Sequence, residues 1–366
     1  MKITCVINSL ANGGAERIMS ILAGAWSERH EVSLLLFEQA FSFYRIDPRV
    51  RIVSLGASFR DKNLWGKLCE LNRLRHALRL ELEALQPEIV ISFMDQANVL
   101  TLCSAPPQTR VIVSERSAPA RSSLSEKGAI LGQLLLYVRN FFYRQAHAVV
   151  VQTDGAQRYF IEHGISTTKV IPNPVVKPNE EPTDKTLPTP CIVSMGRLVA
   201  LKRFDLLIDA FSTIAGKHPQ WHLAILGEGP LHKKLHARAC RYNLADRIHL
   251  LGASTHPHAV LRQAEIFALA SDSEGFPGSL CEAMSTGRAV VSSNCDFGPS
   301  TIIRQGIDGL LVAPGDATAM AAALDQLISD PQLRAELGSA ARSIVERFSL
   351  ERVLELWEEC FGGKNG

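Results

Sequence analysis

The sequence lacks the features of a membrane-spanning, secreted or metal-binding protein. None of its apolar runs reaches the roughly 20 residues that a membrane-spanning helix requires. Residues 1–7 (MKITCVI) have no basic flank, long apolar stretch or small-residue cleavage site, so we expect no secretory signal. The eight cysteines form no Cys-x-x-Cys pair, and none of the eleven histidines has the spacing of metal ligands. We therefore expect a cytoplasmic protein with buried free thiols, no metal and no cofactor.

A strong excess of either charge is also missing. Charged residues make up 21% of the 366 positions, hydrophobic residues make up 46%, and the net charge is +2. Residues 1–170 hold 20 basic and 15 acidic residues, whereas residues 171–366 hold 19 and 22. This asymmetry is too small for a nucleic-acid partner, for which a domain pI above about 9 is expected. The length suits two α/β domains.

Short apolar runs alternate with longer helical patterns along the whole chain. Most runs are continuously apolar, which is typical of strands that are covered on both faces. We expect strands at residues 2–7, 31–37, 51–55, 88–93, 110–114, 147–152, 190–195, 221–226, 247–251, 265–270 and 288–292. Helical patterns fill the gaps, for example at 203–215, 231–243, 257–264 and 317–328. This order predicts an α/β protein with parallel, doubly wound sheets.

A proline-rich stretch divides the chain. Residues 172–190 contain six prolines in nineteen positions, and proline removes backbone donors and fixes φ. We predict an N-terminal Rossmann-like domain at 1–171, a linker at 172–190 and a C-terminal domain at 191–348. A helix at 349–366 is expected to pack back on the N-terminal domain. Two such domains are expected to leave a ligand cleft between the carboxyl ends of their strands.

Two loops after predicted strands have features of anion sites. Gly13 and Gly14 lie between the first strand and a helix, where backbone N–H groups and the helix N-terminus favour an anion. A tight turn with positive φ explains this pair equally well. Arg197 and Lys202 follow the first strand of the second half and suit a diphosphate, although solvated surface charges are the alternative.

Two carboxylates follow the strand at 265–270. Glu274 lies on a loop rich in glycine and proline, and Glu282 lies in the first turn of the next helix. Carboxylates accept hydrogen bonds from vicinal hydroxyls, which sugars and riboses provide. The alternative for Glu282 is a capping box with Ser279 as the N-cap.

Taken together, these motifs resemble the retaining glycosyltransferases of family 4, which have the GT-B fold. The resemblance spans essentially the whole chain. It rests on Glu274 and Glu282 with seven residues between them, Arg197 and Lys202, Gly13-Gly14-Ala15-Glu16, Ile171-Pro172-Asn173-Pro174, Gly227-Glu228-Gly229-Pro230, and Asp308-Gly309-Leu310-Leu311-Val312.

The resemblance implies roles for these residues. Glu274 would hold hydroxyls of the donor sugar and Glu282 those of the ribose. Arg197 and Lys202 would neutralise the leaving diphosphate in place of a metal. Retention is attributed to attack on the front face, with the leaving phosphate accepting the proton. The donor-binding residues would be Gly13, Gly14, Glu282, Gly227, Gly229, Gly275, Phe276, Pro277 and Gly278.

One residue of the first domain departs from the family pattern. Arg116 stands where many members have a histidine that contacts the donor sugar, and arginine cannot act as a base at neutral pH. We expect Arg116 to join the catalytic residues and to bind the sugar, a phosphate or an anionic acceptor. Pairing with Glu115 or another carboxylate is the structural alternative. Asp95 and Glu16 are candidate acceptor-binding residues, and Asp95 is equally explained as a helix N-cap.

The predicted function is transfer of a hexose or N-acetylhexosamine from a UDP-sugar to a glycan or lipid-linked glycan acceptor in cell-surface polysaccharide synthesis. The alternatives are a GT-B nucleotide-sugar epimerase and a non-catalytic nucleotide-sugar-binding subunit. Residues 64–80 and 130–144 combine leucines and aromatics with basic residues. They make the inner face of the cytoplasmic membrane a candidate partner, and ordinary core helices are the alternative.

Overall fold

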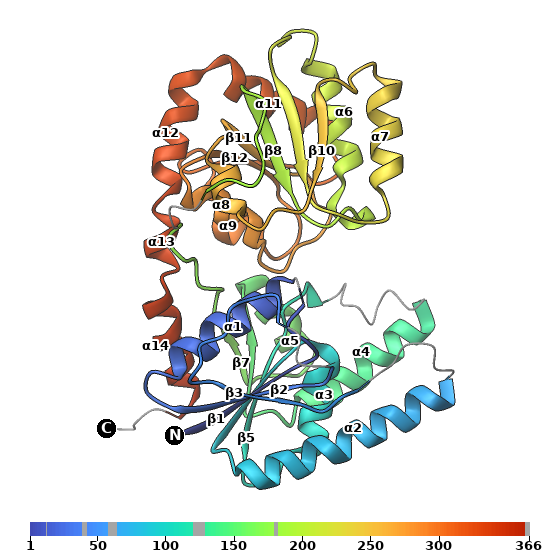
Figure 1. Ribbon diagram of the computed structural model, residues 1–366, viewed down its shortest axis with the longest axis vertical. Coiled ribbons are helices and arrows are strands. Elements are labelled where there is room, and N and C mark those ends of the chain that lie inside the picture. Colours follow the sequence, from blue (N-terminus) through green and yellow to red (C-terminus); the bar gives the residue numbers. More distant parts are fainter. Residues whose placement is uncertain (12, 39–41, 58–63, 120–128, 179–181, 363–366) are drawn as a thin grey trace. The chain divides into compact units, whose positions relative to one another are not determined.

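The computed structural model divides the chain into two compact units, each built on a parallel sheet (Figure 1). Unit 1 comprises Met1–Asn173 and Glu351–Gly366, and unit 2 comprises Pro174–Leu350. The structure describes residues 1–11, 13–38, 42–57, 64–119, 129–178 and 182–362.

Unit 1 contains a seven-stranded sheet in the order β3-β2-β1-β4-β5-β6-β7, with every neighbouring pair parallel. Its strands are β1 (Lys2–Ile7), β2 (Glu31–Leu36), β3 (Arg51–Ser54), β4 (Ile89–Phe93), β5 (Arg110–Ser114), β6 (Ala148–Val151) and β7 (Thr168–Val170). Its helices are α1 (Gly14–Trp26), α2 (Leu64–Leu85), α3 (Asp95–Ser104), α4 (Ala129–Tyr143), α5 (Asp154–Glu162) and α14 (Leu350–Cys360). The strand order reverses between β1 and β4, which makes their carboxyl ends a topological switch point.

Unit 2 contains a six-stranded parallel sheet in the order β10-β9-β8-β11-β12-β13. Its strands are β8 (Cys191–Met195), β9 (His222–Leu226), β10 (Ile248–Gly252), β11 (Ile266–Leu269), β12 (Ala289–Ser293) and β13 (Leu310–Val312). Its helices are η3 (Ala200–Lys202), α6 (Phe204–Ile214), α7 (His232–Arg241), α8 (Pro257–Leu261), α9 (Gly278–Ser285), α10 (Pro299–Ile302), α11 (Ala317–Ser329), α12 (Pro331–Ala341) and α13 (Ile344–Arg347). The switch point of this sheet lies between β8 and β11.

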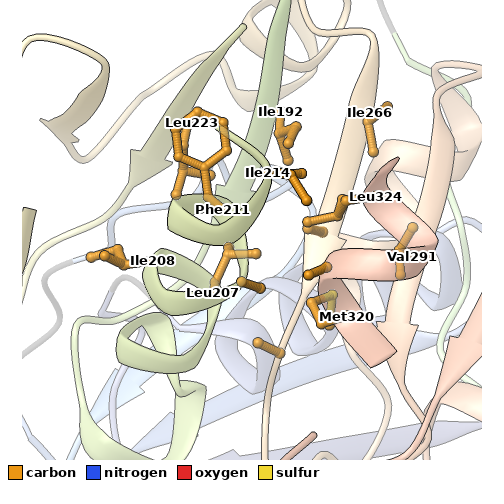
Figure 2. Packing of buried hydrophobic residues seen from close by; sticks show 14 of the residues in the cluster. Ile192, Leu207, Ile208, Phe211, Ile214, Leu223, Ile266, Val291, Met320 and Leu324 are labelled. Atoms are coloured by element: carbon orange, nitrogen blue, oxygen red, sulfur yellow. The ribbon is translucent and has the colours of Figure 1, made fainter. Parts of the chain in front are cut away.

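Successive strand residues point to opposite sides of the unit 2 sheet, and apolar side chains are buried on both sides. Ile192 and Leu223 pack on one face against α6 and α11, where Figure 2 shows Phe211 and Leu324 among the buried side chains. On the other face a second apolar cluster contains Val193, Phe267, Leu269, Leu280 and Met284. The predicted doubly wound architecture is therefore confirmed, and its continuous apolar strands have the expected cause.

Unit 1 is completed by the end of the chain. Helix α14 runs beside α1 (Figure 1), and the ring of Trp357 lies 5.5 Å from that of Trp26. Trp357 also stacks on Phe93 at the end of β4, with ring centroids 6.2 Å apart. Both tryptophans are almost fully buried. Residues beyond 350 thus supply part of the core of the unit that begins at residue 1.

The boundaries differ from the expected ones in two respects. Each expected strand is present within two residues of its predicted ends, but the three-residue strands β7 and β13 were not predicted from the sequence. Much of the stretch expected as a linker packs in unit 2: Val175 and Leu187 belong to its core, and the Val175 amide donates to Phe348 O at 2.7 Å. These apolar side chains anchor a segment that its prolines keep out of helix and sheet.

Candidate functional site

The candidate residues follow the strands at the two switch points. In unit 2, Arg197 and Lys202 follow β8, and Glu274 follows β11. In unit 1, the glycine pair follows β1, and Asp95 follows β4. Because the carboxyl ends of neighbouring parallel strands meet at one edge of a sheet, residues far apart in sequence are brought together there.

Lys202 and Glu274 form an ion pair at the switch point of unit 2. Lys202 Nζ donates to Glu274 Oε1 at 2.6 Å, and Ser271 Oγ donates to the same oxygen at 2.6 Å. The Glu274 side chain is 9% exposed and that of Lys202 is 20% exposed. The stem of Lys202 lies close to Gly196, where an added Cβ would be 3.5 Å from Lys202 Cε, an ordinary van der Waals contact. Burying a carboxylate to this degree is costly without such hydrogen-bond donors.

Further contacts fix the loops that carry this pair. The Asp272 amide donates to Leu201 O at 2.9 Å, and Arg203 Nη1 donates to Asp272 Oδ1 at 3.0 Å. Arg203 adopts the left-handed conformation with φ 48° between η3 and α6. Ser271, Asp272 and Arg203 were not among the site residues predicted from the sequence. The detectable signal was that Ser271 and Asp272 come directly after a predicted strand.

The loop around Glu274 is packed against the loop that follows β12. Glu274 forms a parallel bridge with Phe297, and a Cβ on Gly298 would lie 2.7 Å from Pro277 Cδ and 3.1 Å from Gly275 O. Phe276 lies in the core with its ring 5.4 Å from that of Phe348. The buried positions of Phe276 and Pro277 identify a structural role for both, and Gly275 is half-buried beside them.

The expected capping box at Glu282 does not form. Helix α9 begins at Gly278, its N-cap is Pro277, and no side chain caps it. Ser279 lies within the first turn, because the N-cap is Pro277, in an extended conformation, two residues before the expected one. A Cβ on Gly278 would meet nothing within 4 Å, so the approach to this helix end is open. The half-buried Glu282 side chain lies four residues along.

Two glycines after β9 are required by the neighbouring strand. Gly227 has φ 138°, and a Cβ there would collide with Gly196 O; a Cβ on Gly229 would collide with Leu198 O. The Leu198 amide donates to Glu228 O at 2.8 Å. These glycines therefore hold the loops after β8 and β9 together, and this backbone contact accounts for them. Arg197, on the first of these loops, is exposed.

The glycine pair of unit 1 does not form a turn with positive φ. Gly13 is the N-cap of α1 with φ −147° and ψ 160°, and Gly14 is the first helical residue. This extended conformation is open to any residue, so the positive-φ alternative is wrong. A Cβ on Gly13 would collide with the Glu16 carboxylate, whereas a Cβ on Gly14 would meet nothing within 4 Å. The open side of the loop is at Gly14.

A buried polar cluster lies behind the carboxyl ends of β4 and β5. It consists of Asp95, Glu115, Arg139 and Tyr143. Arg139 Nη1 lies 3.4 Å from Glu115 Oε2 and 3.9 Å from Asp95 Oδ1, and Tyr143 Oη donates to Glu115 Oε2 at 3.2 Å. Burial, together with the charge of Asp95 and a hydrogen bond to it, raises the pKa of Glu115 well above its ordinary value. Asp95 is the first residue of α3 rather than its N-cap, which is Met94 with φ 81°.

Arg116 lies apart from this cluster. Its Cζ lies 4.1 Å from the centre of the Phe93 ring, and its Nη1 donates to Ser114 Oγ at 3.3 Å. Its Nη2 is buried and has no hydrogen-bond partner among the described residues. The expected alternative, an ion pair with Glu115, does not form, because the Glu115 side chain turns to the cluster. Burial lowers the pKa of Arg116 to about 9, and the guanidinium remains charged at neutral pH.

The cysteines of the protein are free thiols, as expected. All eight cysteines are unbridged; five are buried, and Cys69 and Cys240 are exposed. His258, next to the loop before α8, is buried. Within the described ranges, no group of three or more His, Cys, Asp or Glu side chains is arranged to hold a metal ion. None of the helices that the structure describes has the length and apolar character needed to cross a membrane.

Comparison with known proteins defines the class. The family model "Glycosyl transferases group 1" matches residues 177–344, and the model "Glycosyl transferase 4-like domain" matches residues 13–174. The lipopolysaccharide 1,6-galactosyltransferase of Escherichia coli is 30% identical, and the match covers 90% of this chain and 89% of that protein. The protein is thus a sugar-transferring enzyme. More narrowly, the chain belongs to the group 1 glycosyltransferases, which confirms the family and the enzyme class that its motifs resemble.

Two further proteins agree with this class. The GalNAc-alpha-(1->4)-GalNAc-alpha-(1->3)-diNAcBac-PP-undecaprenol alpha-1,4-N-acetyl-D-galactosaminyltransferase of Campylobacter jejuni is 27% identical, over 98% of this chain and 97% of that protein. The crystal structure of Anabaena HepE in complex with UDP-glucose has a TM-score of 0.76 at 20% identity and covers 98% of this chain and 99% of that one. The structural likeness confirms the expected GT-B fold.

Proposed function

We propose that this glycosyltransferase moves a hexose or N-acetylhexosamine from a UDP-sugar to a glycan or lipid-linked glycan acceptor in cell-surface polysaccharide synthesis, with retention of configuration. The C. jejuni and E. coli relatives act on an undecaprenol-linked glycan and on lipopolysaccharide by name. HepE was crystallised with UDP-glucose. These names support the choice of donor and acceptor.

The Lys202–Glu274 pair carries the proposal. Both hydrogen bonds to the Glu274 carboxylate go to Oε1, and within the described residues Oε2 accepts none. Oε2 is the atom that we assign to a hydroxyl of the donor sugar. The carboxylate is fixed before substrate arrives, since Lys202 and Ser271 hold it from two elements. A carboxylate that is already in place can stabilise the transition state without having to reorganise during the reaction.

The cations of the same edge suit the leaving group. When the bond between the anomeric carbon of the donor sugar and the diphosphate breaks, negative charge develops on the diphosphate oxygens. Arg197 is exposed after β8, and Lys202 is placed by Glu274, so we assign both to that charge and propose that no metal is needed. In this scheme the diphosphate itself accepts the acceptor proton, and Glu282 holds the ribose.

The function is tested by incubating the protein with UDP-hexoses and UDP-N-acetylhexosamines, with and without an undecaprenyl-diphosphate-linked acceptor. We expect UDP release and a lengthened acceptor only when both substrates are present. Glu274→Gln is expected to lower transfer by about 100-fold, whereas Glu336→Gln, an exposed glutamate of the same unit, leaves it unchanged. An epimerised donor without acceptor would identify an epimerase instead.

We also propose a cytoplasmic location with unit 1 bound to the inner face of the membrane. Helix α4 supports this, because most of its exposed side chains are apolar and its one charged residue, Arg139, is buried. The large exposed apolar side chains are Leu131, Leu134, Tyr137, Val138 and Phe141, and Gln133 is the exposed polar residue among them. On α2, by contrast, Arg73 pairs with Glu70 and Arg79 with Glu83, which weakens the basic character expected for that helix.

Flotation with vesicles of phosphatidylethanolamine and phosphatidylglycerol tests this location. We expect the protein to float with the vesicles and Leu134→Glu and Tyr137→Glu to remain below. Ile161→Glu changes a similarly exposed apolar residue on α5 of the same unit and should still float. Equal behaviour of the α4 variants and the unaltered protein would refute the proposal.

A further inference from the structure

Arg116 is a cation whose hydrogen-bond and ring contacts among the described residues of unit 1 are with uncharged groups. Within the part of the chain that the structure describes, no carboxylate forms an ion pair with it. Its partners are the Phe93 ring face and one hydroxyl, neither of which neutralises a guanidinium. Holding a partly buried charge without an opposite charge is unfavourable, so this arrangement is expected where a ligand supplies the anion.

The side chains of the two neighbouring acids are engaged with other groups. Glu115 is adjacent in sequence, but its carboxyl group faces Arg139, Tyr143 and Ser117. The Asp95 carboxyl group is hydrogen-bonded with the Glu115 carboxyl group and lies 3.9 Å from Arg139 Nη1. Both acids thus have Arg139 as their basic neighbour, and neither forms an ion pair with Arg116.

The position of the guanidinium is set by two contacts. It lies over the ring of Phe93, which is fully buried and stacks on Trp357, and it donates to Ser114 Oγ. An aromatic ring and a hydroxyl thus place it, rather than an acid. The planar fork of a guanidinium matches two oxygens of a phosphoryl group better than it matches a sugar hydroxyl.

We propose that Arg116 forms an anion subsite of unit 1 that binds a phosphate or diphosphate group of a substrate. The inference rests on the proposed function, which offers two sources of that group: the donor diphosphate, and the diphosphate that links a glycan acceptor to its lipid. Arg116 would then distinguish phosphorylated substrates from neutral ones of the same shape.

Calorimetric titration of the full chain separates the two sources. One arm titrates UDP. The other titrates inorganic pyrophosphate into protein saturated with UDP, which occupies the donor position. Arg116→Gln is expected to weaken the affinity for either UDP or pyrophosphate by about tenfold or more. Arg116→Lys should weaken the same affinity less, because lysine keeps the positive charge but loses the two-pronged guanidinium. Arg158→Gln, an exposed arginine on α5, serves as the control.

The outcomes are distinct. Weaker UDP binding assigns the subsite to the donor, and weaker pyrophosphate binding with unchanged UDP assigns it to the acceptor. Unchanged affinity in both arms overturns the proposal. Thermal unfolding gives a second readout: Arg116→Met should raise Tm, since it removes an uncompensated charge, and a fall in Tm would indicate a structural role. If no UDP binds at all, the proposed function fails, and pyrophosphate titrated alone still tests Arg116.

Discussion

Lys202 and Glu274 approach each other from opposite sides of the unit 2 switch point, with 2.6 Å between Nζ and Oε1. One follows β8 and the other follows β11, the two strands where the order of the sheet reverses. Because both side chains are largely buried, each would be costly to leave without the other. The ion pair therefore joins the loops after β8 and β11, so the residues of the candidate donor site also help to hold unit 2 together.

We expect the two residues to be energetically coupled. Lys202→Met and Glu274→Gln should each lower the free energy of unfolding, and the double variant should lose less than the sum by about 1–3 kcal/mol. Urea unfolding of the four proteins measures this. Additive losses would mean that the ion pair contributes nothing to stability, and the site would then have to be organised by substrate.

Gly14→Ala separates ligand approach from folding. Gly14 is the first residue of α1, and the added Cβ would meet nothing within 4 Å. Alanine suits a helix better than glycine, so stability should be equal or higher by up to about 1 kcal/mol. If donor phosphates approach this loop, UDP affinity should nevertheless fall, which titration of UDP measures. Unchanged affinity would remove Gly14 from the donor-binding residues.

Glu115→Gln should alter how stability depends on pH. In the folded protein the pKa of Glu115 is raised above its ordinary value of 4.5. At pH values between these two pKa values, the folded state therefore binds more protons than the unfolded state. The stabilisation from Glu115 is complete at low pH and declines as pH rises above about 4.5. Glutamine carries no such proton, so the variant should gain stability relative to the unaltered protein between pH 5 and pH 8.

Urea unfolding at pH 5, 6.5 and 8 checks this slope. Glu162→Gln replaces an exposed glutamate of the same unit and should leave the difference constant with pH. A constant difference for Glu115→Gln as well would show that Glu115 is ionised in the folded protein.

Trp357→Ala should destabilise unit 1. The ring is 1% exposed and packs against Trp26 and Phe93. Removing a buried tryptophan leaves a cavity, for which a loss of about 3–5 kcal/mol is typical. Trp65→Ala, at a residue 77% exposed, should change stability by less than about 0.5 kcal/mol. Equal effects of the two substitutions, measured by chemical denaturation, would contradict the role of α14 in the core.

The sequence was sufficient to predict the two sheets, because their strands are continuous apolar runs of the right length. It was insufficient for β7 and β13, whose three residues carry too little pattern. The contact between Lys202 and Glu274 depends on β8 and β11 being neighbours, which the order of strands along the chain does not reveal. Ser279 failed as an N-cap because Pro277 already starts α9. The ring under Arg116 likewise comes from another strand, β4.

The position of Trp357 also determines the order in which the protein is completed during synthesis. The ribosome releases Trp26 and Phe93 early, whereas their partner on α14 emerges only after all of unit 2. Unit 2 is continuous in sequence and has all of its residues before the last helix is made. The unit whose synthesis begins first is therefore the last to acquire its full core, and a nascent chain stopped before residue 350 would expose the aromatic surface that α14 covers.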